Sequence, residues 1–153
     1  SHSTFCAASR KTGSIKSMVP FSHVYFGGKS FDTMQKEYPD TIGKIEKDNV
    51  MNLVRKGGFD IVNGKSRTEF GIGLAACQII KAILRDEKRI MPVSVALHGQ
   101  YGWEGVSAGV PCVIGKDGVE EIIEISLVPD EKALFDHSCE VIKGYIEKAD
   151  KAE

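Results

Sequence analysis

Apolar and polar side chains alternate over residues 93–98, which is the period of two that a half-buried β-strand shows. A second apolar run, at residues 110–114, is joined to a third, at residues 119–127, by the sequence Gly-Lys-Asp-Gly at residues 115–118. The Asp-Gly pair supplies the positive φ that a tight hairpin needs. Residues 90–127 therefore predict an antiparallel sheet, and the rest of the chain is interpreted relative to it.

Three stretches outside this sheet carry apolar side chains at helical spacing, near residues 49–62, 67–86 and 130–147. The middle stretch is apolar around most of its circumference, so we expect other elements to cover it on several sides. Pro129 suits the first position of the last helix, and the two acidic residues after it suit the N-terminal end of the helix dipole. This last helix is amphipathic and is expected to pack on the sheet.

The segments between these elements are less regular. A β-rich run around Val24, before Gly27-Gly28, predicts a further strand that ends in a turn. Pro39-Asp40 predicts the entry of a helix, whereas residues 1–16 have no useful period and are expected to be irregular. Together these elements predict a mixed α/β fold, more strictly α+β, with antiparallel strands packed by long helices.

Composition narrows the class of protein. With 153 residues the chain is long enough for one domain with a core of its own. A net charge of -1, with 27% charged residues of both signs, gives no basic face for nucleic acid. No apolar run approaches the roughly 18 residues of a membrane span. The sequence therefore predicts a soluble protein that binds neither nucleic acid nor a membrane.

The four cysteines are scattered without the spacing of a metal site. Three of them lie inside apolar segments, so we expect buried, reduced thiols rather than disulfides or zinc ligands. This pattern favours a cytoplasmic protein with no metal site. The cysteines are Cys6, Cys77, Cys112 and Cys139.

Residues 71–76, Gly-Ile-Gly-Leu-Ala-Ala, fit the GxGxxA pattern of dinucleotide-binding loops. Such a loop brings backbone N–H groups against a pyrophosphate at a helix N-terminus. The apolar run before it, residues 59–62, is short, and no acidic residue follows about 20 residues later. We therefore expect these glycines to permit close helix packing, and an independent nucleotide-binding βαβ unit remains the weakest alternative.

The longest informative stretch, HGQYGWEGVSAGVPCVIGKDGVEEIIEISL at residues 98–127, resembles the C-terminal domain of the NAD-dependent L-lactate and L-malate dehydrogenase family. In that family a strand leads into a Gly-x-Tyr-Gly turn, followed by a Gly-Val-Pro strand and an Asn/Asp-Gly hairpin. The resemblance extends from about residue 17 to 146. It implies a substrate-binding domain at residues 17–148, preceded by a leader at 1–16 that is foreign to the family and followed by a frayed tail at 149–153.

The same resemblance implies two site residues. Residues 66–75, SRTEFGIGLA, are similar to the start of the family's active-site helix, where a Thr lines the substrate pocket and an Ile packs on the nicotinamide ring. These roles correspond to Thr68, for the 2-hydroxy or 2-oxo acid substrate, and Ile72, for NAD. Read without the family, Thr68 would cap the helix and Ile72 would belong to the core. The Thr favours lactate over malate as the parent substrate.

The family's acid–base histidine has no counterpart at its expected place. The family motif leads directly into a run like Met18-Val19-Pro20, and ungapped comparison places Ser14 where the histidine would lie. His2 would take that place only with an insertion of about ten residues. We expect structural or surface roles for the other histidines, with no metal ligation; these are His23, His98 and His137.

The remaining parts of the family's active site lie in a Rossmann domain that precedes this half. Because hydride transfer needs a held cofactor and a general base, we expect the 153 residues alone to be inactive. The second hypothesis is a non-catalytic fragment that acts as an oligomerisation or interaction module, since a domain deprived of its Rossmann partner would expose an apolar face. A homo-oligomer is expected in either case.

Overall fold

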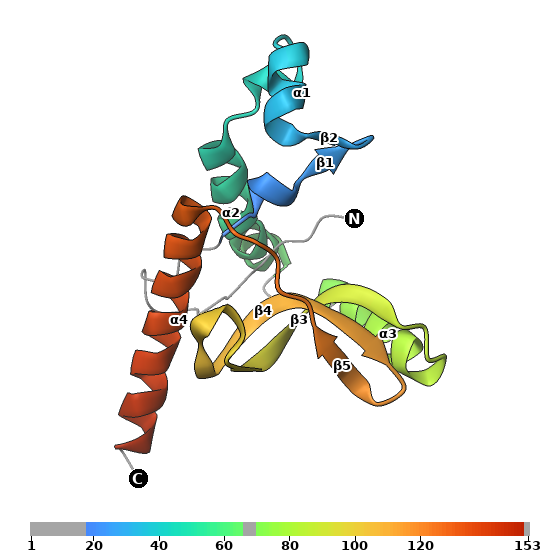
Figure 1. Cartoon of the computed structure of the whole chain (residues 1–153), viewed down its shortest axis with the longest axis vertical. Helices are drawn as coiled ribbons and strands as arrows, with labels where there is room; N and C mark the ends of the chain where they lie inside the picture. The colour runs from blue at the N-terminus through green and yellow to red at the C-terminus, as the bar shows by residue number, and fades with distance from the viewer. Residues whose placement is uncertain (1–17, 66–69, 152–153) are drawn as a thin grey trace.

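The computed structural model describes residues 18–65 and 70–151, which form two lobes (Figure 1). The sheet lobe contains β3, β4 and β5 with helices α3 and α4, and the small lobe contains α1, α2 and the hairpin β1–β2. The predicted α+β class is confirmed, because the strand pairings among the described residues are antiparallel and long helices pack beside them.

The sheet has the order β3-β4-β5, with β3 at Arg89–His98, β4 at Glu104–Gly115 and β5 at Gly118–Ile122. The predicted hairpin is confirmed: Gly115 pairs with Gly118, whose φ of 88° is the left-handed conformation that glycine allows. Side chains alternate along β3 as the sequence predicts, with Leu97 buried and His98 exposed. The sheet therefore turns one apolar face toward the helices.

The core lies between that face and the two helices of the sheet lobe. Along β4 every second side chain is buried, from Val106 to Ile114. Ala82 of α3 (Phe70–Leu84) and both Phe135 and Cys139 of α4 (Pro129–Asp150) join the same cluster. Pro129 and two acidic residues occupy the first turn of α4, as predicted.

The turn between β3 and β4 is fixed by Tyr101. Its backbone adopts φ 55°, its side chain is buried, and its ring centroid lies 5.0 Å from that of Phe135. The hydroxyl donates to the carbonyl of Ile123 at 3.1 Å and accepts the amide of Ile125 at 3.0 Å, while the Tyr101 amide donates to Glu124 at 2.6 Å. One side chain thereby joins this turn to the segment that leaves β5.

The small lobe begins with a 3-10 helix, η1 (Phe21–His23), followed by β1 (Tyr25–Phe26) and β2 (Lys29–Ser30). The strand predicted around Val24 is therefore only two residues long, but it does end in the predicted Gly27-Gly28 turn, with φ of 56° and 86°. Residues 21–23, which were expected to belong to the strand, form the 3-10 helix instead.

Helix α1 (Phe31–Glu37) was not predicted, and the helix entry predicted at Pro39-Asp40 is wrong. Ser30 caps α1 by accepting the amide of Thr33 at 3.3 Å, and Phe31 is buried with its ring centroid 5.2 Å from that of Phe21. A cap and one aromatic anchor suffice for a helix of seven residues, too short to show a clear period. The chain continues through η2 (Ile42–Lys44) to α2 (Lys47–Lys65), which runs unbroken through Gly57-Gly58.

The expected covering of the helix at residues 67–86 is not observed. Of the described residues of α3 only Ala82 is buried, whereas Phe70 and Leu84 are each 81% exposed. The helix rests on β4 through its C-terminal half, where Ile79 and Ile83 are half-buried. Thus a single narrow stripe of a nearly all-apolar helix is packed in this chain.

Candidate functional site

The candidate site lies at the N-terminal half of α3, where apolar side chains project away from the sheet. Ile72, the residue expected beside the nicotinamide ring, is 64% exposed, and Leu74 is exposed to the same extent. The core role that local sequence favoured for Ile72 is therefore wrong, because no element of the described chain covers this part of the helix. An exposed β-branched side chain here offers an apolar wall to a ligand or partner.

The other residues expected in the site, Thr68 and Ser14, lie outside the described residues, as does His2. Their assignments remain predictions. Within residues 18–65 and 70–151 no group of His, Cys, Asp or Glu is arranged to hold a metal ion. None of the helices in those ranges combines the length and apolar character needed to cross a bilayer.

The glycines of the GxGxxA pattern do not form a phosphate-binding loop. Gly71 and Gly73 lie inside α3, and the element before it is the helix α2 rather than a strand, so residues 71–76 belong to no βαβ unit. Their expected role in close helix packing is not observed in the part of the chain that the structure describes, where a Cβ added at either glycine would meet nothing within 4 Å. Residues 71–76 therefore do not form the strand–loop–helix arrangement that holds a pyrophosphate.

The three described histidines lie on separate elements, and none belongs to α3. His98 ends β3 and is exposed, and His137 is on the exposed side of α4, as predicted. His23 lies in η1 rather than in a strand, and its Nδ1 is 2.9 Å from the Ser22 hydroxyl.

The expectation of buried thiols is correct for two of the described cysteines. Burial raises the pKa of the Cys112 thiol, and it raises that of Cys139 to about 11. Cys77 is exposed, because α3 turns this side away from the sheet. All three are free thiols.

Comparison with known proteins decides the family. Residues 20–153 match the family described as lactate/malate dehydrogenase, alpha/beta C-terminal domain. The chain belongs to this family.

Relatives in this dehydrogenase family are longer than the chain. It is 39% identical over 127 residues to the L-lactate dehydrogenase of Fusobacterium nucleatum, covering 83% of this chain and 40% of that protein. It is 36% identical over 129 residues to L-lactate dehydrogenase 3 of Bacillus cereus, covering 84% and 41%. The chain thus spans about two-fifths of the length of these relatives.

Solved structures of the dehydrogenase family share the fold. A minor L-lactate dehydrogenase from Enterococcus mundtii superposes with a TM-score of 0.75 at 34% identity, over 87% of this chain and 42% of that one. The malate dehydrogenase from Aeropyrum pernix gives 0.72 at 30% identity, over 86% and 42%. Both lactate and malate enzymes therefore contain the arrangement of lobes described here.

The chain also contains a buried polar cluster that its sequence pattern did not lead us to expect. Glu131 of α4 is only 9% exposed, and its carboxylate accepts both the amide and the hydroxyl of Ser22, at 2.9 and 2.5 Å. A signal was present in the sequence, because Glu131 is spaced four residues before Phe135 and seven before Ser138 on the apolar side of α4. A charged residue at such a position predicts a polar partner, although not which one.

Proposed function

We propose that this chain is the substrate-binding part of an NAD-dependent L-2-hydroxy acid dehydrogenase that is lactate-like, with malate as the other substrate to consider. The parent reaction is reversible hydride transfer between a 2-hydroxy acid and the 2-oxo acid. The observation that carries the proposal is the family match over residues 20–153, with relatives named L-lactate dehydrogenase.

The family resemblance assigns two residues to the pocket: Thr68, which precedes α3 in the sequence, and Ile72 in the first turn of α3. The Thr68 hydroxyl would hydrogen-bond the anionic substrate near the helix N-terminus, where the helix dipole favours negative charge. Ile72 would pack on the nicotinamide ring and exclude water from the hydride path. The 64% exposure of the Ile72 side chain supports this role, because a ring can reach it without displacing any described part of the chain.

NAD is proposed as the cofactor from the family assignment, and it would supply or accept the hydride. These 153 residues would contribute an apolar wall, without the glycine-rich loop that holds a pyrophosphate. Ser14 stands where the family has its acid–base histidine, and a serine hydroxyl does not titrate near neutral pH. We therefore propose that the isolated chain does not catalyse the oxidation of 2-hydroxy acids or the reduction of 2-oxo acids.

The isolated chain is tested by NADH fluorescence and by reduction of pyruvate and oxaloacetate, at several protein concentrations. We expect neither binding nor turnover. Turnover by the purified 153-residue chain would contradict the inactivity proposal and the assignment of Ser14.

The parent function is tested in a chimera that joins the N-terminal part of the Fusobacterium nucleatum relative, through its histidine motif, to residues 17–153 of this chain. We expect NADH-dependent reduction of pyruvate, which Thr68→Ala and Ile72→Gln lower by about 10- to 100-fold in kcat/KM. Leu53→Gln is the matched control, because Leu53 is 69% exposed on α2. A folded chimera that reduces neither acid would overturn the proposed function.

The alternative, an interaction module that forms homo-oligomers, is favoured by the uncovered face of α3. Phe70, Ile72, Leu74, Ile80 and Leu84 are all more than half exposed on this one helix. Apolar residues gathered in this way mark an interaction site or a risk of aggregation, and a helix that is apolar all round is normally covered. This proposal is compatible with the first, since both need a partner surface on α3.

Mass in solution tests the alternative. Sedimentation equilibrium is expected to give at least a dimer of the 16.7 kDa chain, and Ile80→Gln with Leu84→Gln is expected to shift it toward monomer. Leu53→Gln serves again as the control. A wild-type monomer at all concentrations would refute the oligomer.

A cytoplasmic location is also proposed, from the free cysteines.

A further inference from the structure

The two lobes are joined at the beginning of α4. Figure 1 shows the start of this helix beside η1 of the small lobe, while its middle packs on the sheet lobe. Two hydrogen bonds connect Ser22 of the small lobe to the side chain of Glu131 on α4. These partners are 109 residues apart in the sequence, so the contact is made by tertiary structure alone.

Glu131 accepts two hydrogen bonds from the same residue. Both carboxylate oxygens of Glu131 are used, one by the Ser22 amide and one by its hydroxyl, and the carboxylate is almost fully buried. Because the single hydroxyl proton is donated to Glu131, the bond between Ser22 and His23 requires a proton on His23 Nδ1. A hydrogen-bonded chain thus runs from the exposed imidazole through Ser22 to the buried carboxylate.

The residues on either side of Ser22 connect it to the rest of the small lobe. The Phe21 ring packs on Phe31, the carbonyl of Val24 accepts the amide of Phe31 at 2.9 Å, and Lys47 Nζ lies 5.6 Å from both ring centroids. These contacts connect Ser22 to α1 and to the first residue of α2. Holding Ser22 on α4 therefore holds these elements of the small lobe against α4.

We propose that Glu131 is a positioning residue that latches the small lobe, residues 21–65, onto α4. It acts through Ser22 and orients His23 as the third member of the chain. The inference deepens the proposed function, and rests on it only for its consequence: the latch holds Ser22, eight residues after position 14 in the sequence, relative to the sheet lobe. Breaking it would leave each lobe folded but free the angle between them.

The first test is hydrogen exchange of the Ser22 amide, measured by NMR in the unliganded chain. Glu131→Ala removes both acceptors, and we expect exchange of this amide to be about 10- to 100-fold faster. Glu131→Gln keeps one carbonyl acceptor for the amide and is expected to restore most of the protection. Ser22→Ala keeps the amide and is expected to have a smaller effect, which disappears in the Glu131→Ala background. Glu147→Ala, at an exposed position of α4, is the matched control.

The second test separates a latch from an ordinary local contact. Spin labels at positions 36 and 143, both exposed and one on each lobe, report the distance between the lobes in a Cys6→Ser, Cys77→Ser background. We expect one narrow distribution that broadens in Ser22→Ala and Glu131→Ala, narrows again in Glu131→Gln, and is unchanged in Glu147→Ala. Unchanged distributions in the first two variants would overturn the latch. Because no ligand is used, that failure is distinct from failure of the dehydrogenase assignment.

Discussion

The Tyr101 hydroxyl is predicted to be a main support of the sheet lobe. Tyr101→Phe keeps the ring against Phe135 but removes the bonds to the Ile123 carbonyl and the Ile125 amide, at 3.1 and 3.0 Å. A buried hydrogen bond contributes about 1 kcal/mol, and the part-buried amide left without its partner adds a desolvation cost, so we expect a loss of about 2–3 kcal/mol. For a chain of this length that corresponds to a fall in Tm of about 5–10 °C.

Urea denaturation followed by circular dichroism measures this loss, with Tyr145→Phe as the control because Tyr145 is 40% exposed on α4. A pH series adds a second readout. Burial raises the pKa of Tyr101 above its ordinary value of 10.0, so the folded state retains this proton when the unfolded state loses it. The stabilisation contributed by the protonated Tyr101 hydroxyl should be fully present below pH 10 and should be lost as the pH rises above it. Tyr101→Phe should therefore remove this contribution to the fall in stability at alkaline pH. Equal losses in the two variants, with no change in the alkaline limb, would refute the reasoning.

Three further predictions concern single positions. Gly118→Ala should lower the free energy of unfolding by about 1–2 kcal/mol, because residue 118 has a φ of 88°. Gly144→Ala should raise it by about 0.5–1 kcal/mol, because a Cβ at this position of α4 would lie in open space. Shifts of the urea midpoint in opposite directions would check both. Cys139→Ala should flatten the loss of stability as pH rises from 9 through about 11, since its raised pKa keeps the native thiol protonated; an unchanged alkaline limb would contradict this. Leu97→Ala, at a fully buried position, should cost about 2–5 kcal/mol, against less than about 0.5 for Leu53→Ala; similar urea midpoints would refute the assigned core.

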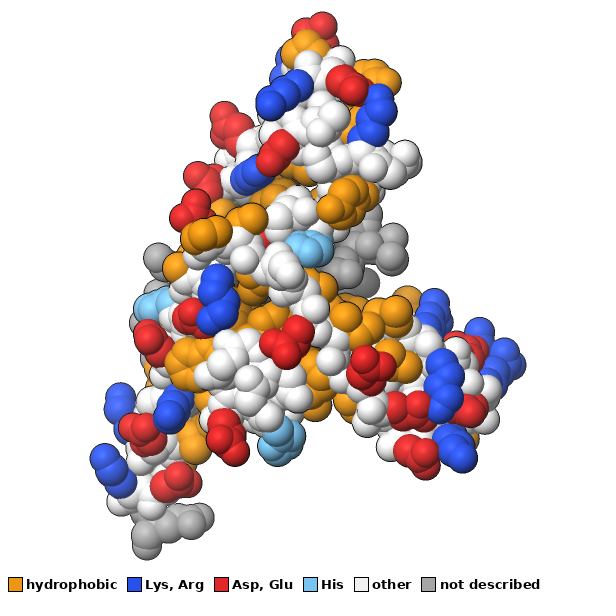
Figure 2. Space-filling view, viewed as in Figure 1, with side chains coloured by type: hydrophobic (Ala, Val, Ile, Leu, Met, Phe, Trp, Pro, Cys, Tyr) orange, Lys and Arg blue, Asp and Glu red, His pale blue; other side chains and the backbone are white. Residues whose placement is uncertain are grey.

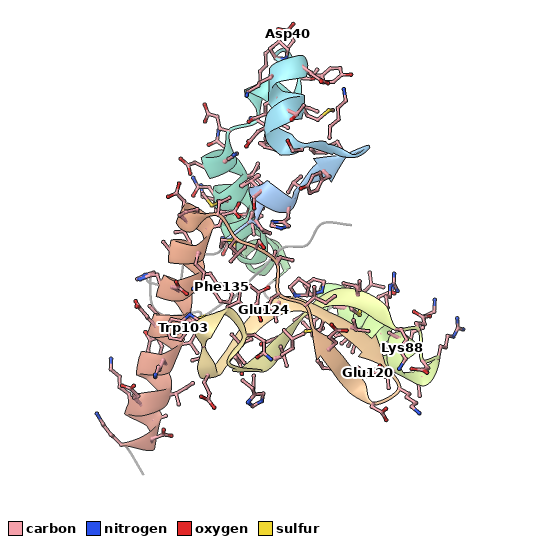
Figure 3. The ribbon with its side chains drawn as sticks, viewed as in Figure 1. Asp40, Lys88, Trp103, Glu120, Glu124 and Phe135 are labelled. Atoms are coloured by element: carbon pink, nitrogen blue, oxygen red, sulfur yellow. The ribbon has the colours of Figure 1, made fainter. Side chains whose placement is uncertain are left out.

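Charged side chains gather at the far end of the β4–β5 hairpin, away from the candidate site (Figure 2). Lys88 pairs with Glu120 and lies 3.1 Å from Asp86, whose carboxylate also accepts the Lys116 amide at 2.9 Å (Figure 3). The Lys116 amide and Lys88 lower the pKa of Asp86. This exposed network ties the turn after α3 to the hairpin and gives no reason to place ligand chemistry there.

Local sequence determined the elements whose causes are local. The alternation of residues 93–98, the Gly-Lys-Asp-Gly hairpin and the proline at the start of α4 are all confirmed, because strand period, positive φ and helix entry depend on neighbours in the chain. The family resemblance on residues 98–127 was also sufficient to identify the domain, which the match over residues 20–153 confirms. Helix α1 was not predicted, because its seven residues are too few to show a clear helical spacing of apolar side chains.

Tertiary structure alone decided which side of each element is covered. Ile72 and Ile79 have the same apolar character in sequence, yet one is exposed and the other half-buried, because only the C-terminal half of α3 meets β4. Cys77 and Cys139 likewise differ only in what packs against their helices. The pairing of Ser22 with Glu131 joins residues 109 positions apart, and no local pattern specifies such a partner. Periodicity predicts which side chains of an element share a face, but which part of that face is covered, and which distant residues bond, depend on what the folded chain brings together.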